Sequence, residues 1–156
     1  IAVGDLIGRM VEFYGAMARS RGVELSMSID DDFPALALPE QVLESVIGNL
    51  ISNAIKFTPR SGRVVIKAHV PDDGGPVILV VSDSGGGISP ETAALLMQAV
   101  PVPSTVGPHG DTGSGRGLYL VQEKLREFGI ALEFRRNGHV GTAVVLTVPE
   151  DLVLDA

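Results

Sequence analysis

The sequence contains no cysteine among its 156 residues. Disulfides, thiolate chemistry and cysteine-based zinc sites are therefore excluded, and the composition is compatible with a reducing cytoplasm. Basic residues are also few, with 12 lysines and arginines against 19 aspartates and glutamates and a net charge of −7. Such a chain is a poor general binder of nucleic acid or anionic membranes, so any anionic ligand must be held locally.

Long apolar runs are missing as well. No stretch of about 18 apolar residues could span a bilayer, and the N-terminus lacks the basic-then-apolar order of a signal peptide, so we expect a soluble, cytoplasmic chain. The sequence begins within a helical pattern and without methionine, which predicts a fragment of a longer protein with room elsewhere for membrane segments. Its length and composition predict one domain over residues 1–150, a tail over residues 151–156, and fraying from Pro149 onward.

Helical periodicity of apolar residues covers three stretches of the chain. These are residues 1–21, 39–57 and 118–128, and each is followed by a glycine or a proline that ends the pattern. A shorter helix is expected over residues 90–99, because a proline and a glutamate occupy its first turn. Residues 100–112 contain prolines and glycines without periodicity, and they are expected to be mobile.

Alternating and β-rich segments predict about five strands. A single strand is expected over residues 23–29. Two antiparallel hairpins are expected, with strands at residues 63–70 and 76–82 and at residues 130–136 and 142–148. Mostly antiparallel strands beside three helices with apolar faces predict the α+β class, in the form of a two-layer α/β sandwich.

The helix expected over residues 39–57 carries an unusual polar edge. Asn49, Asn53 and Lys56 are separated by four and then three residues, so they line up along one side of the helix. Carboxamide oxygens suit a hard cation such as Mg²⁺, and an ammonium group attracts phosphate. A solvated polar stripe is the simpler alternative, and it is the favoured interpretation for this helix taken alone.

A glycine-rich loop follows the strand expected at residues 76–82. It reads Asp83-Ser84-Gly85-Gly86-Gly87-Ile88. A carboxylate beside glycines can accept a hydrogen bond from an exocyclic amine such as that of adenine, while the glycines let a ring approach the backbone. Aspartate and glycine are also the commonest turn residues, so a plain turn is the favoured interpretation for this loop alone.

A second glycine-spaced run opens the helix at residues 118–128. It reads Gly113-Ser114-Gly115-Arg116-Gly117-Leu118, and backbone N–H groups at a helix N-terminus attract phosphate. The run is not a P-loop, because no Gly-Lys-Ser/Thr follows. It is also a poor dinucleotide-binding fingerprint, which would directly follow a strand. Alone, it is weak evidence of a phosphate site.

In order and in combination, these segments resemble one family. NLISNAIKFTP at 49–59, DSGGGI at 83–88, GSGRGL at 113–118 and Gly141-Thr142 resemble the N, G1, G2 and G3 boxes of sensor histidine kinase catalytic and ATP-binding domains (HATPase_c). With gyrase and chaperone ATPases, that family forms the GHKL or Bergerat-fold superfamily. The resemblance covers essentially the whole chain, as far as Pro149.

The resemblance implies a Bergerat-type sandwich with a mobile ATP lid over residues 100–112. It implies ATP and Mg²⁺ as cofactors, and transfer of the γ-phosphoryl group to a histidine on an adjacent dimerisation domain of the same protein. A response regulator would then take the phosphate. No nucleic acid is implied, and the intact protein would be a homodimer while this chain would be a monomer.

The resemblance also implies a role for each matching residue. Asn53 looks like the magnesium-coordinating asparagine, Lys56 like the residue that reaches the phosphates, and Phe57 like the aromatic residue that flanks the adenine. Asp83 would hold the adenine amine, supported by Thr142. The remaining cofactor-binding residues would be Gly85, Gly87 and Ile88 around the adenine, and Gly113, Ser114, Gly115, Arg116, Gly117 and Leu118 around the phosphates.

Asn49 is the informative position among the expected catalytic residues, which are Asn49, Asn53 and Lys56. Gyrase and chaperone relatives have a glutamate there that acts as a base for water, whereas an asparagine cannot take a proton. This difference favours keeping ATP until a histidine arrives, so that transfer depends on positioning and on charge stabilisation.

Departures from the family pattern keep other interpretations open. His69, His109 and His139 do not resemble the family's phosphoacceptor, so this chain should not autophosphorylate alone and each histidine is expected to have a structural or solvent role. The two lid phenylalanines of the family would align near Met97 and Val100, so the apolar character is partly kept but the aromatic side chains are lost. Arg116, which replaces a leucine, is expected to be solvent-exposed, with contact to a phosphate as the alternative. A degenerate docking module of the same fold, an ATP-hydrolysing clamp and an anti-sigma-type serine kinase are the rivals; Asn49 argues against the clamp.

Overall fold

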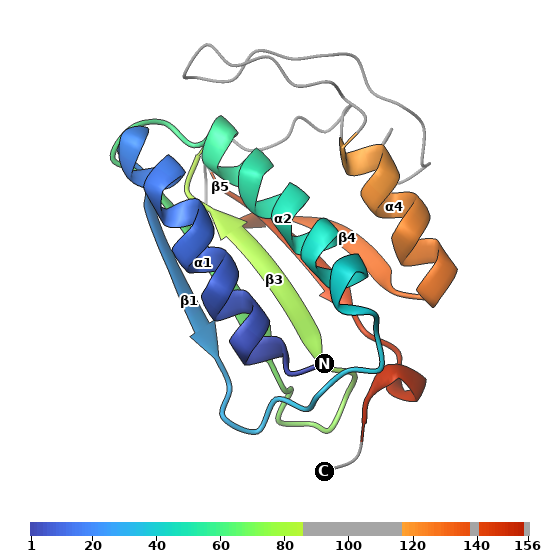
Figure 1. The fold of residues 1–156 in the computed structure, drawn as a ribbon. Coiled ribbons are helices and arrows are strands. Elements are labelled where there is room, and N and C mark those ends of the chain that lie inside the picture. The colour runs from blue at the N-terminus through green and yellow to red at the C-terminus, as the bar shows by residue number, and fades with distance from the viewer. Residues whose placement is uncertain (86–116, 138–140, 155–156) are drawn as a thin grey trace.

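The computed structural model describes residues 1–85, 117–137 and 141–154, and Figure 1 shows their arrangement. Within these ranges, five strands form one sheet, and three α-helices lie side by side on one of its faces. The short helix expected over residues 90–99 and the lid expected over residues 100–112 lie outside the described residues.

The three described α-helices and the five strands match their predicted ranges to within two residues at each end, whereas the short helix η1 was not predicted. No described helix is both long and apolar enough to cross a membrane. The helices are α1 (Val3–Ser20), α2 (Glu40–Phe57), α4 (Gly117–Phe128) and the short 3-10 helix η1 (Glu150–Leu152). The strands are β1 (Glu24–Ile29), β2 (Arg63–His69), β3 (Ile78–Asp83), β4 (Ala131–Asn137) and β5 (Gly141–Thr147).

The sheet has the strand order β1-β2-β3-β5-β4. Strands β1 and β2 are parallel, and the other three neighbouring pairs are antiparallel. A parallel pair needs a long crossover between its strands, and α2 lies in the connection from β1 to β2. The predicted α+β sandwich with a mixed, mostly antiparallel sheet is therefore confirmed.

Helix α2 lies between α1 and α4 and packs on the middle of the sheet (Figure 1). Pro39 precedes its first turn, Glu40 lies in that turn and Lys56 in the last, an arrangement that suits the helix dipole. Its buried face includes Ile47 and Ile51, which join a core that also contains the inward-facing side chains of β2, β3 and β5. The central helix is thereby fixed by the core, while its opposite side stays accessible.

The C-terminal segment is more ordered than the sequence predicts. The prediction that the chain frays from Pro149 onward was wrong for residues 150–154. These residues form η1, which is followed by an antiparallel bridge between Val153 and the fully buried Leu36. The N–H of Ala37 donates a hydrogen bond to the carbonyl oxygen of Leu152 at 2.7 Å, and the N–H of Leu154 donates one to the carbonyl oxygen of Ala35 at 2.9 Å. The partner segment is more than 100 residues away in sequence, so no local pattern could show this pairing.

Candidate functional site

The two asparagines of α2 turn their carboxamide oxygens away from the helix. Nδ2 of Asn53 donates to the backbone carbonyl of Asn49 at 2.8 Å, and Nδ2 of Asn49 donates to that of Ser45 at 2.8 Å. A carbonyl only accepts hydrogen bonds, so the amide nitrogen must face it and the oxygen must face outward. The partly buried Asn53 can therefore offer a neutral oxygen to a cation beside α2.

A cationic and an aromatic side chain meet at the C-terminal end of α2. Nζ of Lys56 lies 4.7 Å from the centroid of the Phe57 ring, within the range of a cation–π contact. Partial burial lowers the pKa of the Lys56 ammonium, and the positive charge of Arg21 lowers it further. Arg21 is the C-cap residue of α1, and its position beside Lys56 was not expected, because the two residues are distant in sequence.

Asp83 is a largely buried carboxylate at the end of β3, with 8% of its surface exposed. Its Oδ1 accepts a hydrogen bond from the N–H of Gly85 at 3.0 Å. Burial raises the pKa of Asp83, and the backbone N–H groups of Gly85 and Thr142 partly counter that rise. Thr142, itself buried, is the register partner of Asp83 between β3 and β5, so the sheet fixes the two side by side.

Gly85 brings the loop after β3 into contact with the end of α2. A Cβ atom at this position would lie 2.8 Å from the carbonyl oxygen of Phe57 and 2.9 Å from Cα of Thr58. Both atoms belong to backbone, which cannot move aside as a flexible side chain would. The absence of a side chain at Gly85 therefore allows two segments that are separate motifs in the sequence to lie in contact.

The turn between α2 and β2 also lies beside these residues, although its sequence predicts only the end of a helix. A Cβ atom on Gly62 would lie 2.3 Å from Cγ2 of Thr58 and 3.1 Å from Oγ of Ser84. Oγ of Ser84 accepts a hydrogen bond from the N–H of Arg63 at 2.8 Å. The signal was present as the turn pair Ser61-Gly62, but the pair alone does not reveal which loop packs against it.

The other expected site residues are only partly within the described ranges. Gly117 and Leu118 begin α4. His69 pairs with Asp30, with 2.9 Å between Nδ1 and Oδ2, a contact consistent with the expected structural role. His109, His139, Met97, Val100, Gly87, Ile88, Gly113, Ser114, Gly115 and Arg116 lie outside the described residues.

The donor groups that are described fit a magnesium nucleotide. Within residues 1–85, 117–137 and 141–154, no group of three acidic or histidine side chains could hold a metal by itself. Mg²⁺ keeps several waters and takes phosphate oxygens as ligands, so the protein supplies few of them, and the outward oxygen of Asn53 is available as one. The carboxylate of Asp83 suits an amine, and Lys56 supplies positive charge.

Replacing Gly85 with alanine tests the contact between the two segments. We expect Gly85→Ala to lower the free energy of unfolding by about 1–3 kcal/mol, because the new methyl group meets fixed backbone. Urea unfolding measures this change. The matched control is Gly75→Ala, where the nearest atom is Oδ1 of Asp73, at 3.1 Å on a movable side chain. Equal stability of Gly85→Ala and Gly75→Ala would contradict the close approach.

The raised pKa of Asp83 predicts a pH-dependent effect of its replacement. Because the folded-state pKa lies above the ordinary value of 3.8, the contribution of Asp83 to stability is fully present below that value and is lost as the pH rises through the folded pKa. Asp83→Asn should therefore have a higher Tm than the parent at neutral pH, and the gain should shrink in acid. Thermal unfolding across a pH series measures this difference, and a lower Tm for Asp83→Asn at neutral pH would contradict it.

Comparison with known proteins identifies the family. The model of the family described as "Histidine kinase-, DNA gyrase B-, and HSP90-like ATPase" matches residues 39–152. Sensor histidine kinase Hik2 of Thermosynechococcus vestitus is 33% identical over 137 residues, which cover 86% of this chain and 34% of that protein. The non-motile and phage-resistance protein of Caulobacter vibrioides is 33% identical over 138 residues, which cover 85% of this chain and 16% of the Caulobacter protein.

Solved structures agree with the fold. Full-length ShkA, crystallised in complex with AMPPNP, superimposes on this chain with a TM-score of 0.80 at 24% identity, covering 100% of this chain and 31% of ShkA. The chain thus spans about a third or less of these longer proteins. With a matching family model over most of its length and sensor kinases among its relatives, the chain belongs to the histidine kinase-, DNA gyrase B- and HSP90-like ATPase family.

Proposed function

We propose that this chain binds Mg-ATP and donates the γ-phosphoryl group to a histidine on an adjacent dimerisation domain of the same protein. A response regulator then takes the phosphate. The observation that carries the proposal is the contact of Gly85 with the backbone of Phe57 and Thr58. Gly85 follows Asp83 by two residues, and Phe57 follows Lys56, so this contact supports a shared site for the carboxylate of Asp83 and the end of α2.

The carboxylate of Asp83 supplies recognition of the base. An oxygen that accepts hydrogen bonds suits the exocyclic amine of adenine and disfavours the carbonyl oxygen that guanine has at the same ring position. A charge-assisted hydrogen bond of this kind contributes about 1.5–3 kcal/mol. The ring of Phe57, beside Lys56, provides an apolar surface for the base.

The end of α2 supplies the phosphate groups with their partners. Lys56 carries the positive charge, and Asn53, whose amide nitrogen is engaged by the carbonyl of Asn49, would hold the cation through its outward oxygen. When bound, Mg²⁺ neutralises phosphate charge as it does in other phosphoryl-transfer sites. The carboxamide of Asn49 cannot accept a proton, so the site holds ATP without activating water.

Transfer requires an acceptor from outside this chain. The imidazole nitrogen forms a bond to the γ-phosphorus while the bond from that phosphorus to the β–γ bridging oxygen breaks, which leaves ADP; the imidazole proton passes to solvent. The support from relatives is that ShkA was crystallised with AMPPNP and that Hik2 is a sensor histidine kinase. We place the reaction in the cytoplasm, the compartment that supplies ATP, with the intact protein as a homodimer and this chain as a monomer.

The test combines this chain with a separately purified dimerisation hairpin of the same protein, magnesium and labelled ATP. We expect label to reach the hairpin histidine with the parent chain and to be lost with Asp83→Ala and Asn53→Ala. The matched control is Asp72→Ala in the exposed turn between β2 and β3, which should transfer like the parent. ATP affinity, measured without the hairpin, should fall roughly 10- to 100-fold in Asp83→Ala.

Two results would contradict the proposal. One is the absence of magnesium-dependent ATP binding by the parent chain, which would indicate a docking module of the same fold. The other is steady ATP hydrolysis without any histidine acceptor, which would indicate an ATPase of the clamp type.

A further inference from the structure

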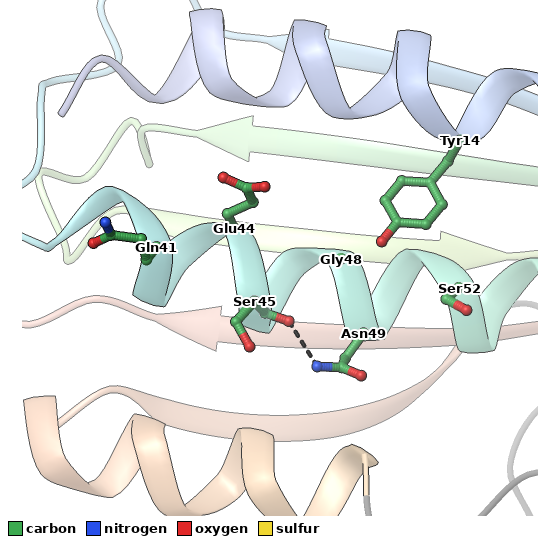
Figure 2. A pocket seen from close by; sticks show the side chains of 7 residues that line it. All are labelled: Tyr14, Gln41, Glu44, Ser45, Gly48, Asn49 and Ser52. Carbon is green, nitrogen blue, oxygen red and sulfur yellow. Dashed lines mark hydrogen bonds between the residues drawn. The ribbon is translucent and has the colours of Figure 1, made fainter.

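A groove runs between α1 and α2 on the side of α2 that faces away from the sheet (Figure 2). It has a volume of about 390 Å³ and is lined by Tyr14 of α1 and by α2 side chains that include Glu44 and Asn49. The ring of Tyr14 lies over α2 beside Gly48, Glu44 projects from α2 toward α1 nearer the start of the helix, and Asn49 lies on the edge of α2 that faces α4. The groove therefore reaches the position that the proposed phosphoryl transfer uses.

A glycine in α2 lets Tyr14 approach the helix closely within the groove. A Cβ atom at Gly48 would lie 2.9 Å from Oη of Tyr14 and 3.4 Å from Cε of Met10, so the phenol crosses directly over the helix backbone. Burial raises the pKa of Tyr14, and the charge of Glu44 adds to the rise. The phenol stays protonated, and the described residues give its hydroxyl no hydrogen-bond partner. A donor is thus available in the groove wall.

An exposed aromatic residue, Phe13, packs against the groove residue Tyr14. Phe13 is 76% exposed, more than either of the other large exposed apolar side chains in the described ranges, Met27 and Leu154. Its ring packs edge-on against Tyr14, with 5.0 Å between the centroids. An exposed aromatic side chain beside a hollow is typical of the residues that dominate binding at protein interfaces.

Glu44 gives the groove one negative charge among its described lining residues. Arg9 of α1 is ion-paired with Glu40 at the start of α2, and its positive charge also attracts Glu44. Glu44 has no ion-pair partner in the described parts of the chain, and it is the one charged side chain among the lining residues. A basic side chain on a partner would complement it.

We propose that this groove docks the helix that carries the acceptor histidine, a deepening of the proposed function on which it rests. The docked helix presents a lysine or arginine to Glu44, an apolar side chain to Phe13, and its histidine toward Asn49. From Gln41 to Ser52 the lined part of α2 measures roughly 16 Å, which matches about three turns of a partner helix.

The hollow on the other side of α2 is a weaker docking surface. It lies between α2 and α4, has a volume of about 670 Å³, and shares Ser45 and Asn49 with the groove. Its α4 wall is formed by Glu123, Lys124, Arg126 and Glu127, which carry both signs of charge and no aromatic ring. These four described residues do not select a partner of one charge, whereas Glu44 does, and Phe13 adds an exposed aromatic ring.

The kinetic test measures phosphoryl transfer as a function of hairpin concentration. Phe13→Ala and Glu44→Lys should each raise the KM for the hairpin about tenfold or more, while the Kd for Mg-ATP stays at the parental value. The control for Phe13→Ala is Leu154→Ala, which removes a different exposed apolar side chain. The control for Glu44→Lys is Glu150→Lys, which makes the same charge change in η1. Both controls should keep the parental KM.

A crosslinking test locates the hairpin directly. Because the chain has no cysteine, a single cysteine can carry a photoreactive crosslinker at one chosen position. Gln41→Cys, in the groove, should capture the hairpin, and Ser26→Cys, exposed on β1, should not.

The outcomes separate the two proposals. If the parent chain transfers phosphate normally, two results would overturn the docking groove alone. One is a parental KM in both Phe13→Ala and Glu44→Lys, and the other is equal capture of the hairpin by Gln41→Cys and Ser26→Cys. A parent chain that does not bind Mg-ATP in the absence of the hairpin overturns the proposed function and the groove with it.

Discussion

The close approach of Gly85 to the C-terminal end of α2 is the contact on which the site depends. The sheet determines where β3 ends, because Asp83 is in register with Val64 on one side and with Thr142 on the other. The core determines where α2 ends, because its buried face packs on that sheet. Gly85 lets these two independently fixed ends touch, so the loop that follows Asp83 lies against the helix end that carries Lys56 and Phe57.

The charged groups of the candidate site lower the stability of the fold, and the same groups suit the binding of an anionic ligand. Asp83 is buried with a raised pKa, so its ionised form costs the fold some free energy at neutral pH. Lys56 is also partly desolvated and lies beside another cation, Arg21. Both costs fall on groups that a bound nucleotide would complement, which is the usual trade between stability and activity in binding sites. The acidic chain thus holds positive charge where an anion is expected.

The sequence predicts well whatever depends on local periodicity. Helix α2, with Asn49 and Asn53 on one edge, follows from apolar spacing alone, and the hairpins follow from alternation and turn residues. Contacts between distant segments were not predictable in this way. Tyr14 crosses α2 at Gly48, and Val153 pairs with Leu36, yet in each case neither partner carries a signal for the other.

Glycine shows why the site itself was only half predictable. In the sequence, Gly85 has the same meaning as any turn glycine, and Gly48 is simply a weak position in a helix. In the structure, each one allows a specific close approach, one to Phe57 and Thr58 and one to Tyr14. The family resemblance supplied the combination of motifs, while the contacts that join Asp83 to α2 needed the three-dimensional arrangement.

The most direct measurement of the central claim is an NMR titration of the chain with AMPPNP, with and without magnesium. If Asp83 and the end of α2 form one nucleotide site, the backbone amide of Gly85 and the side-chain amide of Asn53 should shift together and give the same Kd, and the shift of Asn53 should require magnesium. Saturation of one signal without the other, or different Kd values for the two, would show that the two segments do not share a ligand.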